Sequence, residues 1–309
     1  MAEVAVVFAA DDAYSVPLAV AARSVVDSLS TDQQVRVFVL DMGITSENRT
    51  RIERSLHHDR CTVEWIDSLQ GSVDHFPNTW TAITRATYAR LFIPDVLPDD
   101  TTRALYLDCD VVAIRSVSDL IEVDMNGMAA MAVPDLQSPF VASPSGVPRW
   151  FESGRAASDL NFNAGVMLLD LEMWRNDRLT DELVKYLTDG RHYFAQDQEA
   201  LNVVLAQRIG SLDPRWNQQS ELFRLECEVA LPFSRAEIER LRTDPWIIHY
   251  SNRIKPWHYG HSDHPFASEW YASLDRTAYA GWRPRRSRQY VASIAITRLR
   301  NGAKRLKLV

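Results

Sequence analysis

The chain has 309 residues and a formal net charge of −7, with 46% hydrophobic and 24% charged residues. This composition is typical of a globular protein with a sizeable core, and no run approaches the ~20 consecutive apolar residues of a membrane-spanning helix. Residues 1–8 contain no basic side chain, so they predict a first strand and not a signal peptide. Cys61, Cys109 and Cys227 lack metal-binding spacing and indicate reduced thiols in a cytoplasmic protein.

Charge is distributed unevenly along the chain. Residues 276–309 hold ten Lys and Arg and no acidic residue, whereas residues 1–275 hold 24 Lys and Arg against 41 Asp and Glu. We therefore expect an acidic domain over residues 1–275 and a basic amphipathic tail over residues 276–309. Such a tail is typical of a segment that binds an anionic membrane surface, here the inner face of the membrane, and a solvated tail is the alternative. Nucleic acid is not expected as a partner, because the acidic body would repel it.

The first part of the chain alternates between strand and helix patterns. A strand followed by an apolar helical stripe, repeated at this spacing, predicts an α/β fold with a parallel, doubly wound sheet. Small and acidic residues, Ala9 to Asp12, follow the first strand, at the edge where open α/β sheets bind ligands. The expected elements are strands 3–8, 35–40 and 61–66 and helices 15–29 and 45–56.

The middle of the chain continues this pattern, with one arginine on an apolar face. A helix predicted over residues 81–91 carries Arg90 beside Ile83 and Thr87. Arg90 either closes the edge of the core with a carboxylate or points at an anionic ligand, and the pattern leaves both open. The later expected elements are strands 103–110, 127–133, 162–170 and 246–249, helices 171–174, 181–187 and one from residue 196, and a long loop over 138–158.

Asp108 and Asp110 follow a run of apolar residues with spacing i, i+2. In a strand these positions project from the same side, and two such carboxylates repel unless a cation or a shared proton lies between them. They could end a strand in solvent, form the nucleophilic motif of a haloacid-dehalogenase-type phosphohydrolase, or hold a divalent cation against a phosphate. Dehalogenase chemistry normally uses the first strand of its domain. The late position of Asp108 therefore favours the cation.

His249 offers a third ligand, because it ends another apolar run. A lone histidine there is more often structural than a ligand. Two carboxylates and one imidazole together suit Mn²⁺ better than Ca²⁺. Lys255 follows closely and could neutralise a departing phosphate. The set predicts a substrate that carries a diphosphate and needs a Lewis acid at its leaving group.

Six short motifs occur in order over roughly residues 4–260. They are Phe8–Asp12, Thr87–Leu91, Leu105–Asp110, Phe162–Gly165, Gln196–Gln198 and His249–Trp257. In this order and spacing the chain resembles glycosyltransferase family 8, of the bacterial lipooligosaccharide and lipopolysaccharide α-1,4-galactosyltransferase type. The Asp-x-Asp motif alone would not be specific, whereas six ordered matches are.

The resemblance implies a type-A glycosyltransferase (GT-A) fold over residues 1–275, a Rossmann-like mixed sheet with helices on both faces. It implies a retaining enzyme that uses UDP-galactose or UDP-glucose, Mn²⁺ with Mg²⁺ as the alternative, and a saccharide, glycolipid or glycoprotein acceptor. The implied site consists of metal ligands Asp108, Asp110 and His249, uridine contacts Ala9, Asp11 and Tyr14, donor-sugar contacts Arg90, Asp135, Asn163, Asp197 and Gln198, and diphosphate contacts Asn252 and Lys255.

The resemblance also places an amide, Gln198, nearest the anomeric carbon. A retaining double displacement needs a carboxylate nucleophile there, and Asp197 is expected to hold sugar hydroxyls instead. We therefore expect same-face attack, in which the departing phosphate accepts the acceptor's proton and Gln198 stabilises positive charge at the sugar. A UDP-sugar-binding protein without turnover is the alternative. Asn252 stands where the family commonly has glycine, and the acceptor is the least transferable property.

Overall fold

The computed structural model describes residues 3–30, 32–76, 85–189, 196–223, 231–251, 255–258 and 264–284. Asn252, Cys227 and residues 285–309 of the expected tail lie outside the described residues. Among the helices of the described ranges, none is both long and apolar enough to cross a membrane.

A central sheet of seven strands runs in the order β3-β2-β1-β4-β7-β6-β8. The strands β3, β2, β1 and β4 are parallel neighbours, as the alternating pattern predicted, but β7 is antiparallel to both β4 and β6. The sheet is therefore mixed, as the family resemblance implied, and the parallel pairing predicted from the first part of the chain holds for β3, β2, β1 and β4. The strands are β1 (Glu3–Ala10), β2 (Gln34–Asp41), β3 (Cys61–Ile66), β4 (Arg103–Leu107), β6 (Ala130–Pro134), β7 (Phe162–Asp170) and β8 (Ile209–Ser211).

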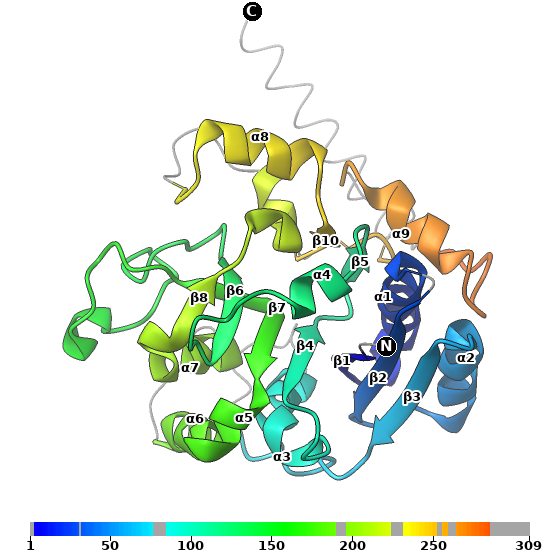
Figure 1. The fold of residues 1–309 in the computed structure, drawn as a ribbon, viewed down its shortest axis with the longest axis horizontal. Coiled ribbons are helices and arrows are strands. Elements are labelled where there is room, and N and C mark those ends of the chain that lie inside the picture. The colour runs from blue at the N-terminus through cyan, green and yellow to red at the C-terminus, as the bar shows by residue number, and fades with distance from the viewer. Residues whose placement is uncertain are drawn as a thin grey trace, which may run out of the picture.

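Helices cover both faces of this sheet (Figure 1). Successive residues of a strand point to opposite faces, and Val6 and Val7 of β1 accordingly lie in two separate apolar clusters. The Val6 cluster includes apolar side chains of α1 (Ser15–Ser28), α2 (Ser46–Leu56), α4 (Ser118–Ile121) and α9 (Ala267–Leu274). The Val7 cluster includes those of α3 (Ile93–Val96), α5 (Leu171–Asn176), α6 (Leu179–Thr188) and α7 (Gln196–Val204).

A second, three-stranded sheet joins distant parts of the chain in the order β5-β10-β9. Its strands are β5 (Val111–Ala113), β10 (Ile247–His249) and β9 (Gln218–Gln219). The strand expected over 103–110 ends at Leu107, and residues 108–110 form the link from β4 to β5. His249 pairs with Val111 across the antiparallel β5–β10 ladder. This pairing brings the histidine next to Asp110.

Three further features of the structure were not expected from the sequence. Residues 85–92 form 3-10 turns in place of an α-helix, and residues 81–84 of that expected helix lie outside the described residues. The helices α8 (Arg235–Thr243) and α9 were not predicted. The first expected tail residues, 276–284, pack on the domain, because Tyr279 is buried and its hydroxyl donates to Asn48 Oδ1 at 3.0 Å.

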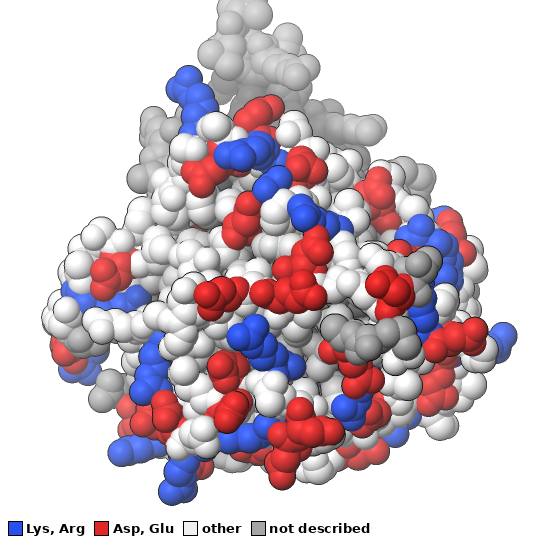
Figure 2. All heavy atoms as spheres, in the orientation of Figure 1, with Lys and Arg blue, Asp and Glu red and all other residues white. Residues whose placement is uncertain are grey.

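Charged side chains of both signs are interspersed over the described part of the face in Figure 2. The described residues also form exposed ion pairs, such as Arg208 with Asp177 at 2.7 Å. Exposed pairs of this kind contribute little to stability. On this face, the acidic excess of the sequence is therefore spread out and does not form one large patch.

Candidate active site

The site is built on an irregularity in β7. Ala132 of β6 pairs with Met167, yet the next residue, Val133, pairs with Asn163, so that residues 164–166 form a bulge. Bulges re-aim backbone groups and are frequent beside active sites. Here the backbone N–H of Ala164 and that of Gly165 donate to side chains in place of β6, while the carbonyl of Gly165 accepts from Asp108 N at 2.8 Å.

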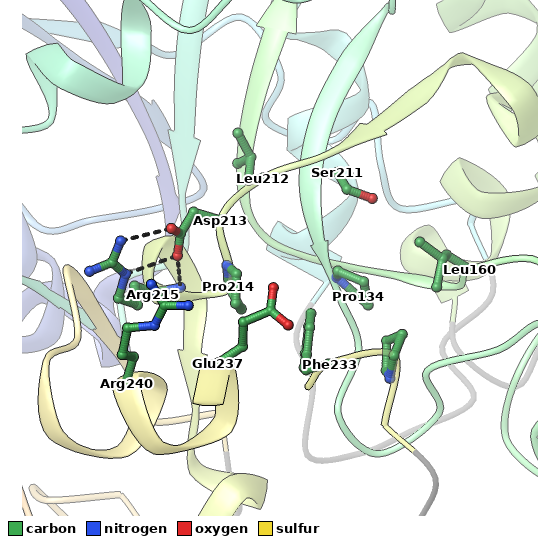
Figure 3. A pocket seen from close by; sticks show the side chains of 11 residues that line it. Pro134, Leu160, Ser211, Leu212, Asp213, Pro214, Arg215, Phe233, Glu237 and Arg240 are labelled. Carbon is green, nitrogen blue, oxygen red and sulfur yellow. Dashed lines mark hydrogen bonds and ion pairs between the residues drawn. The ribbon is translucent and has the colours of Figure 1, made fainter. Parts of the chain in front are cut away.

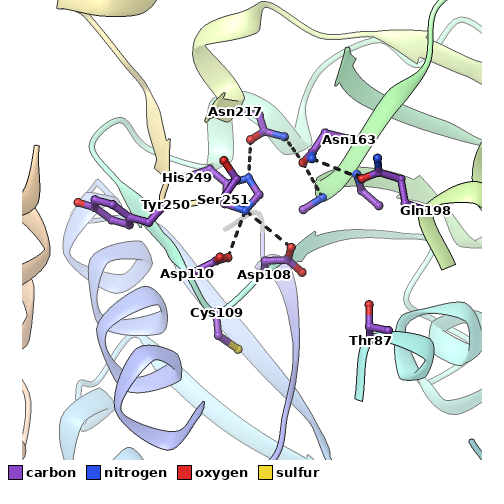
Figure 4. A network of polar contacts seen from close by, with 12 residues as sticks. Thr87, Asp108, Cys109, Asp110, Asn163, Gln198, Asn217, His249, Tyr250 and Ser251 are labelled. Atoms are coloured by element: carbon purple, nitrogen blue, oxygen red, sulfur yellow. Dashed lines mark hydrogen bonds and ion pairs between the residues drawn. The ribbon is translucent and has the colours of Figure 1, made fainter. Parts of the chain in front are cut away.

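Asp108, Asp110 and His249 form a compact cluster of potential metal ligands (Figure 4). One ligand atom from each lies within 4.8 Å of the others. His249 Nε2 is 3.2 Å from Asp110 Oδ1 and 3.8 Å from Asp108 Oδ2. The i, i+2 aspartates therefore do face one position, although they do so from a link between strands.

The electrostatics of this cluster favour a positive charge between the carboxylates. Burial disfavours the charged forms, but Lys255 and His249 outweigh it and hold the pKa of Asp110 well below its usual range. Burial likewise disfavours the imidazolium of His249, yet the neighbouring carboxylate of Asp110 raises the pKa of His249 above its usual value. Lys255 Nζ donates to Asp110 Oδ2 and to the Tyr250 carbonyl, each at 2.5 Å. A metal cation between the carboxylates would therefore compete with the ammonium group of Lys255 and with the added proton of the His249 imidazolium.

Arg90 connects the cluster of potential metal ligands to the start of α7. Its Nη2 donates to Asp108 Oδ1 at 3.0 Å and its Nη1 to the Ala164 carbonyl at 2.7 Å. Its Nε lies 2.9 Å from Asp197 Oδ2 but off the direction of the N–H bond, which makes the contact an ion pair without a hydrogen bond. The structure thus shows Arg90 as a buried arginine paired with carboxylates, and those carboxylates belong to the candidate site. A contact of Arg90 with an anionic ligand stays a prediction.

Asp135, Asn163 and Gln198 form a second hydrogen-bonded cluster beside the first. Asn163 Nδ2 and Gln198 Nε2 both donate to Asp135 Oδ2 at 3.1 Å. Gln198 Oε1 accepts from the N–H of Ala164, also at 3.1 Å. Asp135 Oδ1 accepts two backbone N–H groups from the turn that follows it. These hydrogen bonds hold each amide in one orientation. Amides fixed in this way suit a binding surface that positions a ligand ring with polar substituents.

The segment after β1 lies against the cluster of potential metal ligands. Cys109 Sγ lies 3.4 Å from the carbonyl of Ala9, and burial raises the pKa of the Tyr14 hydroxyl, with Asp110 raising it further. Asp11 Oδ1 is buried and has no hydrogen-bond partner in the described structure. A buried carboxylate oxygen without a partner is costly unless a ligand supplies a donor.

Two buried amides of the site were not predicted. Asn217 Oδ1 lies 2.8 Å from His249 Nδ1, and Asn202 Nδ2 donates to the backbone carbonyl of Gln198 at 2.9 Å. For Asn217 a weak signal was present in the sequence. The uncharged polar run Asn217 to Ser220 follows a tryptophan, and all four residues are buried. Buried polar side chains usually have specific partners.

A separate cavity of about 320 Å³ lies beyond the end of β6 (Figure 3). Pro134, Leu160 and Phe233 supply apolar lining, and Asp213 on its wall pairs with Arg215 at 2.8 Å. None of the candidate site residues described in the preceding paragraphs lines this cavity. The candidate active site is therefore identified by its cluster of polar side chains and not by this cavity, which is a separate feature.

A model of glycosyl transferase family 8 matches residues 5–260. The chain belongs to glycosyltransferase family 8. General stress protein A of Bacillus subtilis is 26% identical over 278 residues, which cover 89% of this chain and 94% of that protein. The lipopolysaccharide 1,3-galactosyltransferase of Salmonella typhimurium is 28% identical over 187 residues, or 57% of this chain and 50% of that one. The family 8 chain thus spans half the length of this second relative.

Solved structures agree with the mixed sheet of this family 8 protein. The galactosyltransferase LgtC, in complex with donor and acceptor sugar analogs, superposes with a TM-score of 0.70 at 28% identity, over 88% of this chain and 96% of that one. The bifunctional glycosyltransferase WbbM superposes with a TM-score of 0.75 at 21% identity, over 89% of this chain and 50% of that one, and supports the fold alone. The fold is the GT-A fold that the resemblance implied, and the chain is a glycosyltransferase by family.

Proposed function

We propose that this family 8 member transfers galactose or glucose from a UDP-sugar to a saccharide, glycolipid or glycoprotein acceptor, with retention of configuration. The observation that carries the proposal is that Asn217 joins the two clusters, so that the potential metal ligands and the Asn163–Gln198 amides belong to one largely buried hydrogen-bond network. Relatives named lipopolysaccharide 1,3-galactosyltransferase and lipopolysaccharide 1,2-glucosyltransferase support these two sugars and a cell-surface glycan acceptor.

The donor atoms of Asp108, Asp110 and His249 fit a divalent cation of borderline softness. Two carboxylates and an imidazole suit Mn²⁺, with Mg²⁺ as the alternative. When bound, the ion would act as a Lewis acid on the diphosphate leaving group. Lys255, now on Asp110, would be freed to neutralise the same phosphate charge. The unpartnered Asp11 Oδ1 supports a base that offers an N–H, as uracil does.

The chain's own residues favour attack on the face from which UDP leaves. Asp197 is buried and paired with Arg90, so it is not a free nucleophile. In the proposed step the bond from the anomeric carbon to the phosphate oxygen breaks. The acceptor oxygen bonds to that carbon on the same face, and its proton passes to the phosphate of the departing UDP. Gln198, fixed by Ala164 N–H, presents its amide to the sugar.

A panel of UDP-sugars tests this function. With Mn²⁺ present, we expect UDP release from UDP-galactose or UDP-glucose that rises when saccharide acceptors are added, and we expect EDTA to abolish it. Product NMR should show retained anomeric configuration. UDP-sugar binding with no release under any condition would contradict the proposal and indicate a binding protein.

Replacing Gln198 with alanine is expected to slow transfer by a factor on the order of 10² while UDP affinity is largely kept, because the amide acts at the sugar and not at the nucleotide. Transfer rates and calorimetric UDP binding check this. Gln207→Ala is the matched control, since Gln207 is exposed and lies outside the network. Unchanged turnover in Gln198→Ala would contradict the assigned role.

A further inference from the structure

Asn217 lies between the two clusters of the site (Figure 4). It is fully buried, at the end of the 3-10 turn Pro214–Asn217, and its side chain has a partner on each side. Its Oδ1 lies 2.8 Å from His249 Nδ1, and its Nδ2 donates to Asn163 Oδ1 at 2.9 Å. Among the described residues, no other side chain links the metal-ligand cluster to Asn163 by hydrogen bonds.

The orientation of each group follows from one backbone donor. The N–H of Gly165 can only donate, and it meets Asn163 Oδ1 at 3.0 Å, so this atom is an acceptor. The Asn217 atom that faces Asn163 Oδ1 must therefore be the NH₂ group, and the carbonyl oxygen of Asn217 must face His249. An oxygen at that place requires a proton on His249 Nδ1. The lone pair of the neutral imidazole is then on Nε2, which faces both aspartates.

The same logic orients the sugar-side amides. With Oδ1 of Asn163 fixed as an acceptor, its Nδ2 donates to Asp135 Oδ2 at 3.1 Å. The neighbouring N–H of Ala164 fixes Gln198 Oε1 in the same way. The N–H groups of two consecutive bulge residues, Ala164 and Gly165, thus fix which atom donates and which accepts in the amides of Gln198, Asn163 and Asn217. The oxygen of Asn217 in turn fixes the tautomer of the His249 imidazole.

The backbone that carries Asn217 is firmly held. Asp213 Oδ1 caps the turn by accepting from Arg215 N at 3.0 Å. The rings of Trp216 and Trp246 pack edge to face, with centroids 4.8 Å apart, and the Arg215 guanidinium stacks 3.7 Å from the Trp246 ring. A residue on such a rigid support can set the position of its partners.

We propose that Asn217 is a positioning residue that holds His249 in its metal-binding tautomer and, through the same amide, holds Asn163 beside the donor sugar. The part that concerns metal and sugar rests on the proposed function. The tautomer itself does not, because it is a property of the protein without metal or donor.

Two variants separate the two hydrogen bonds of the Asn217 amide. Asn217→Leu removes both hydrogen bonds and keeps a similar side-chain volume. Asn217→Asp keeps an oxygen towards His249 Nδ1 but has no donor for Asn163 Oδ1. In Asn217→Leu we expect the Nδ1–H preference to be lost and the Mn²⁺ dissociation constant to rise about 10- to 100-fold, the usual effect of removing such a partner. In Asn217→Asp we expect the tautomer to be kept, with Mn²⁺ affinity within about threefold of the parent and turnover lowered about tenfold.

The tautomer is measured by ¹⁵N NMR of His249 in metal-free protein under alkaline conditions, where the ring is neutral. Mn²⁺ affinity is measured by electron paramagnetic resonance, and kcat and KM by UDP release. The matched control is Asn161→Leu, which removes a buried amide that donates to the Ser138 carbonyl at 2.7 Å, away from His249. It should leave the His249 tautomer and Mn²⁺ affinity unchanged.

Three results would overturn the proposal. One is a parent-like tautomer and Mn²⁺ affinity in Asn217→Leu. Another is equal loss of Mn²⁺ affinity in Asn217→Asp and Asn217→Leu, which would make Asn217 a packing residue. The third is loss of affinity in Asn161→Leu as well. If Asn217→Leu does not fold, Asn217→Asp still tests the proposal. A changed tautomer in that variant contradicts the role assigned to the hydrogen bond between residue 217 and His249 Nδ1. Absence of UDP release in the parent would overturn the proposed function and leave the tautomer result intact.

Discussion

Replacing Gly165 with alanine is expected to weaken Mn²⁺ binding by a factor on the order of 100 or more and to abolish transfer, because the proposed metal ligands themselves would be displaced, and not only the residues that support them. A Cβ at this position would overlap His249 Cε1 and lie 2.8 Å from Asp108 Oδ2. His249 cannot turn away freely, since it is buried and bound to Asn217. The bulge of β7 holds the backbone of Gly165 against Asp108 N, so the backbone cannot retreat easily either.

Gly210→Ala is the matched control for this substitution. A Cβ at Gly210 would also overlap a neighbour, but that neighbour is the flexible end of Met131, on the β6–β8 side of the sheet. Calorimetry with Mn²⁺ and thermal unfolding should therefore show a folded Gly165→Ala protein whose Mn²⁺ affinity is lowered by about 100-fold or more, and a Gly210→Ala protein close to the parent. Mn²⁺ affinity in Gly165→Ala within about threefold of the parent would contradict the assigned ligands.

The sequence predicted much of the fold because the strands and helices of its first part carry strong periodic patterns. Strands over 3–8 and 35–40 lie within β1 and β2, and the helix over 45–56 is α2. The direction of β7 could not be predicted in this way. All but the last residue of β7 are buried, and a strand buried on both faces has the same continuous apolar pattern whether its neighbours run parallel or antiparallel.

The helix α8 was missed because its apolar face is very small. Leu241 is its only buried residue. A local signal was nevertheless present, since Ser234 and Glu237 have the spacing of a capping box, and the structure forms both of its hydrogen bonds. The spacing of Ser234 and Glu237 therefore marks the start of this helix where the apolar pattern does not.

The candidate site was predicted unevenly for a physical reason. Asp108, Asp110 and His249 interrupt apolar runs, so they are conspicuous in the sequence. Asn217 interrupts nothing and belongs to a run of uncharged polar residues that is equally compatible with an exposed loop. Its proposed role depends on a contact with Asn163, which is 54 positions away. Such a contact is set by the bulge in β7, and a bulge leaves little trace in a strand pattern.

Replacing Arg90 with methionine is expected to lower the free energy of unfolding by about 3–5 kcal/mol, the usual cost of leaving a buried charge without its partner. Asp197 is the residue left behind, with an exposed side-chain fraction of 7%. Asp108 also loses its contact with Arg90, but it is more exposed and keeps the hydroxyl of Tyr106. Urea unfolding of parent and variant measures the difference.

Arg155→Met is the matched control for Arg90→Met. Arg155 is as buried, with a side-chain exposed fraction of 6%, and donates to two backbone carbonyls at 2.8 Å. Its nearest carboxylate, Asp159, is exposed and 3.7 Å away, so no buried charge remains when Arg155 is removed. We expect this variant to lose about 1–3 kcal/mol, the cost of the unpaired carbonyls. An equal loss in both variants would mean that packing, and not the charge of Asp197, determines the effect.

The pH dependence of Arg90→Met gives the sharper test. Burial already raises the pKa of Asp197 despite the opposing charge of Arg90, and without Arg90 it should rise further. A carboxyl group whose pKa is higher in the folded than in the unfolded state favours folding at low pH and loses that contribution as the pH rises through the folded-state pKa. The deficit of Arg90→Met relative to the parent should therefore shrink on acidification. Adding Asp197→Asn should restore part of the stability at neutral pH, and strictly additive losses would contradict the coupling.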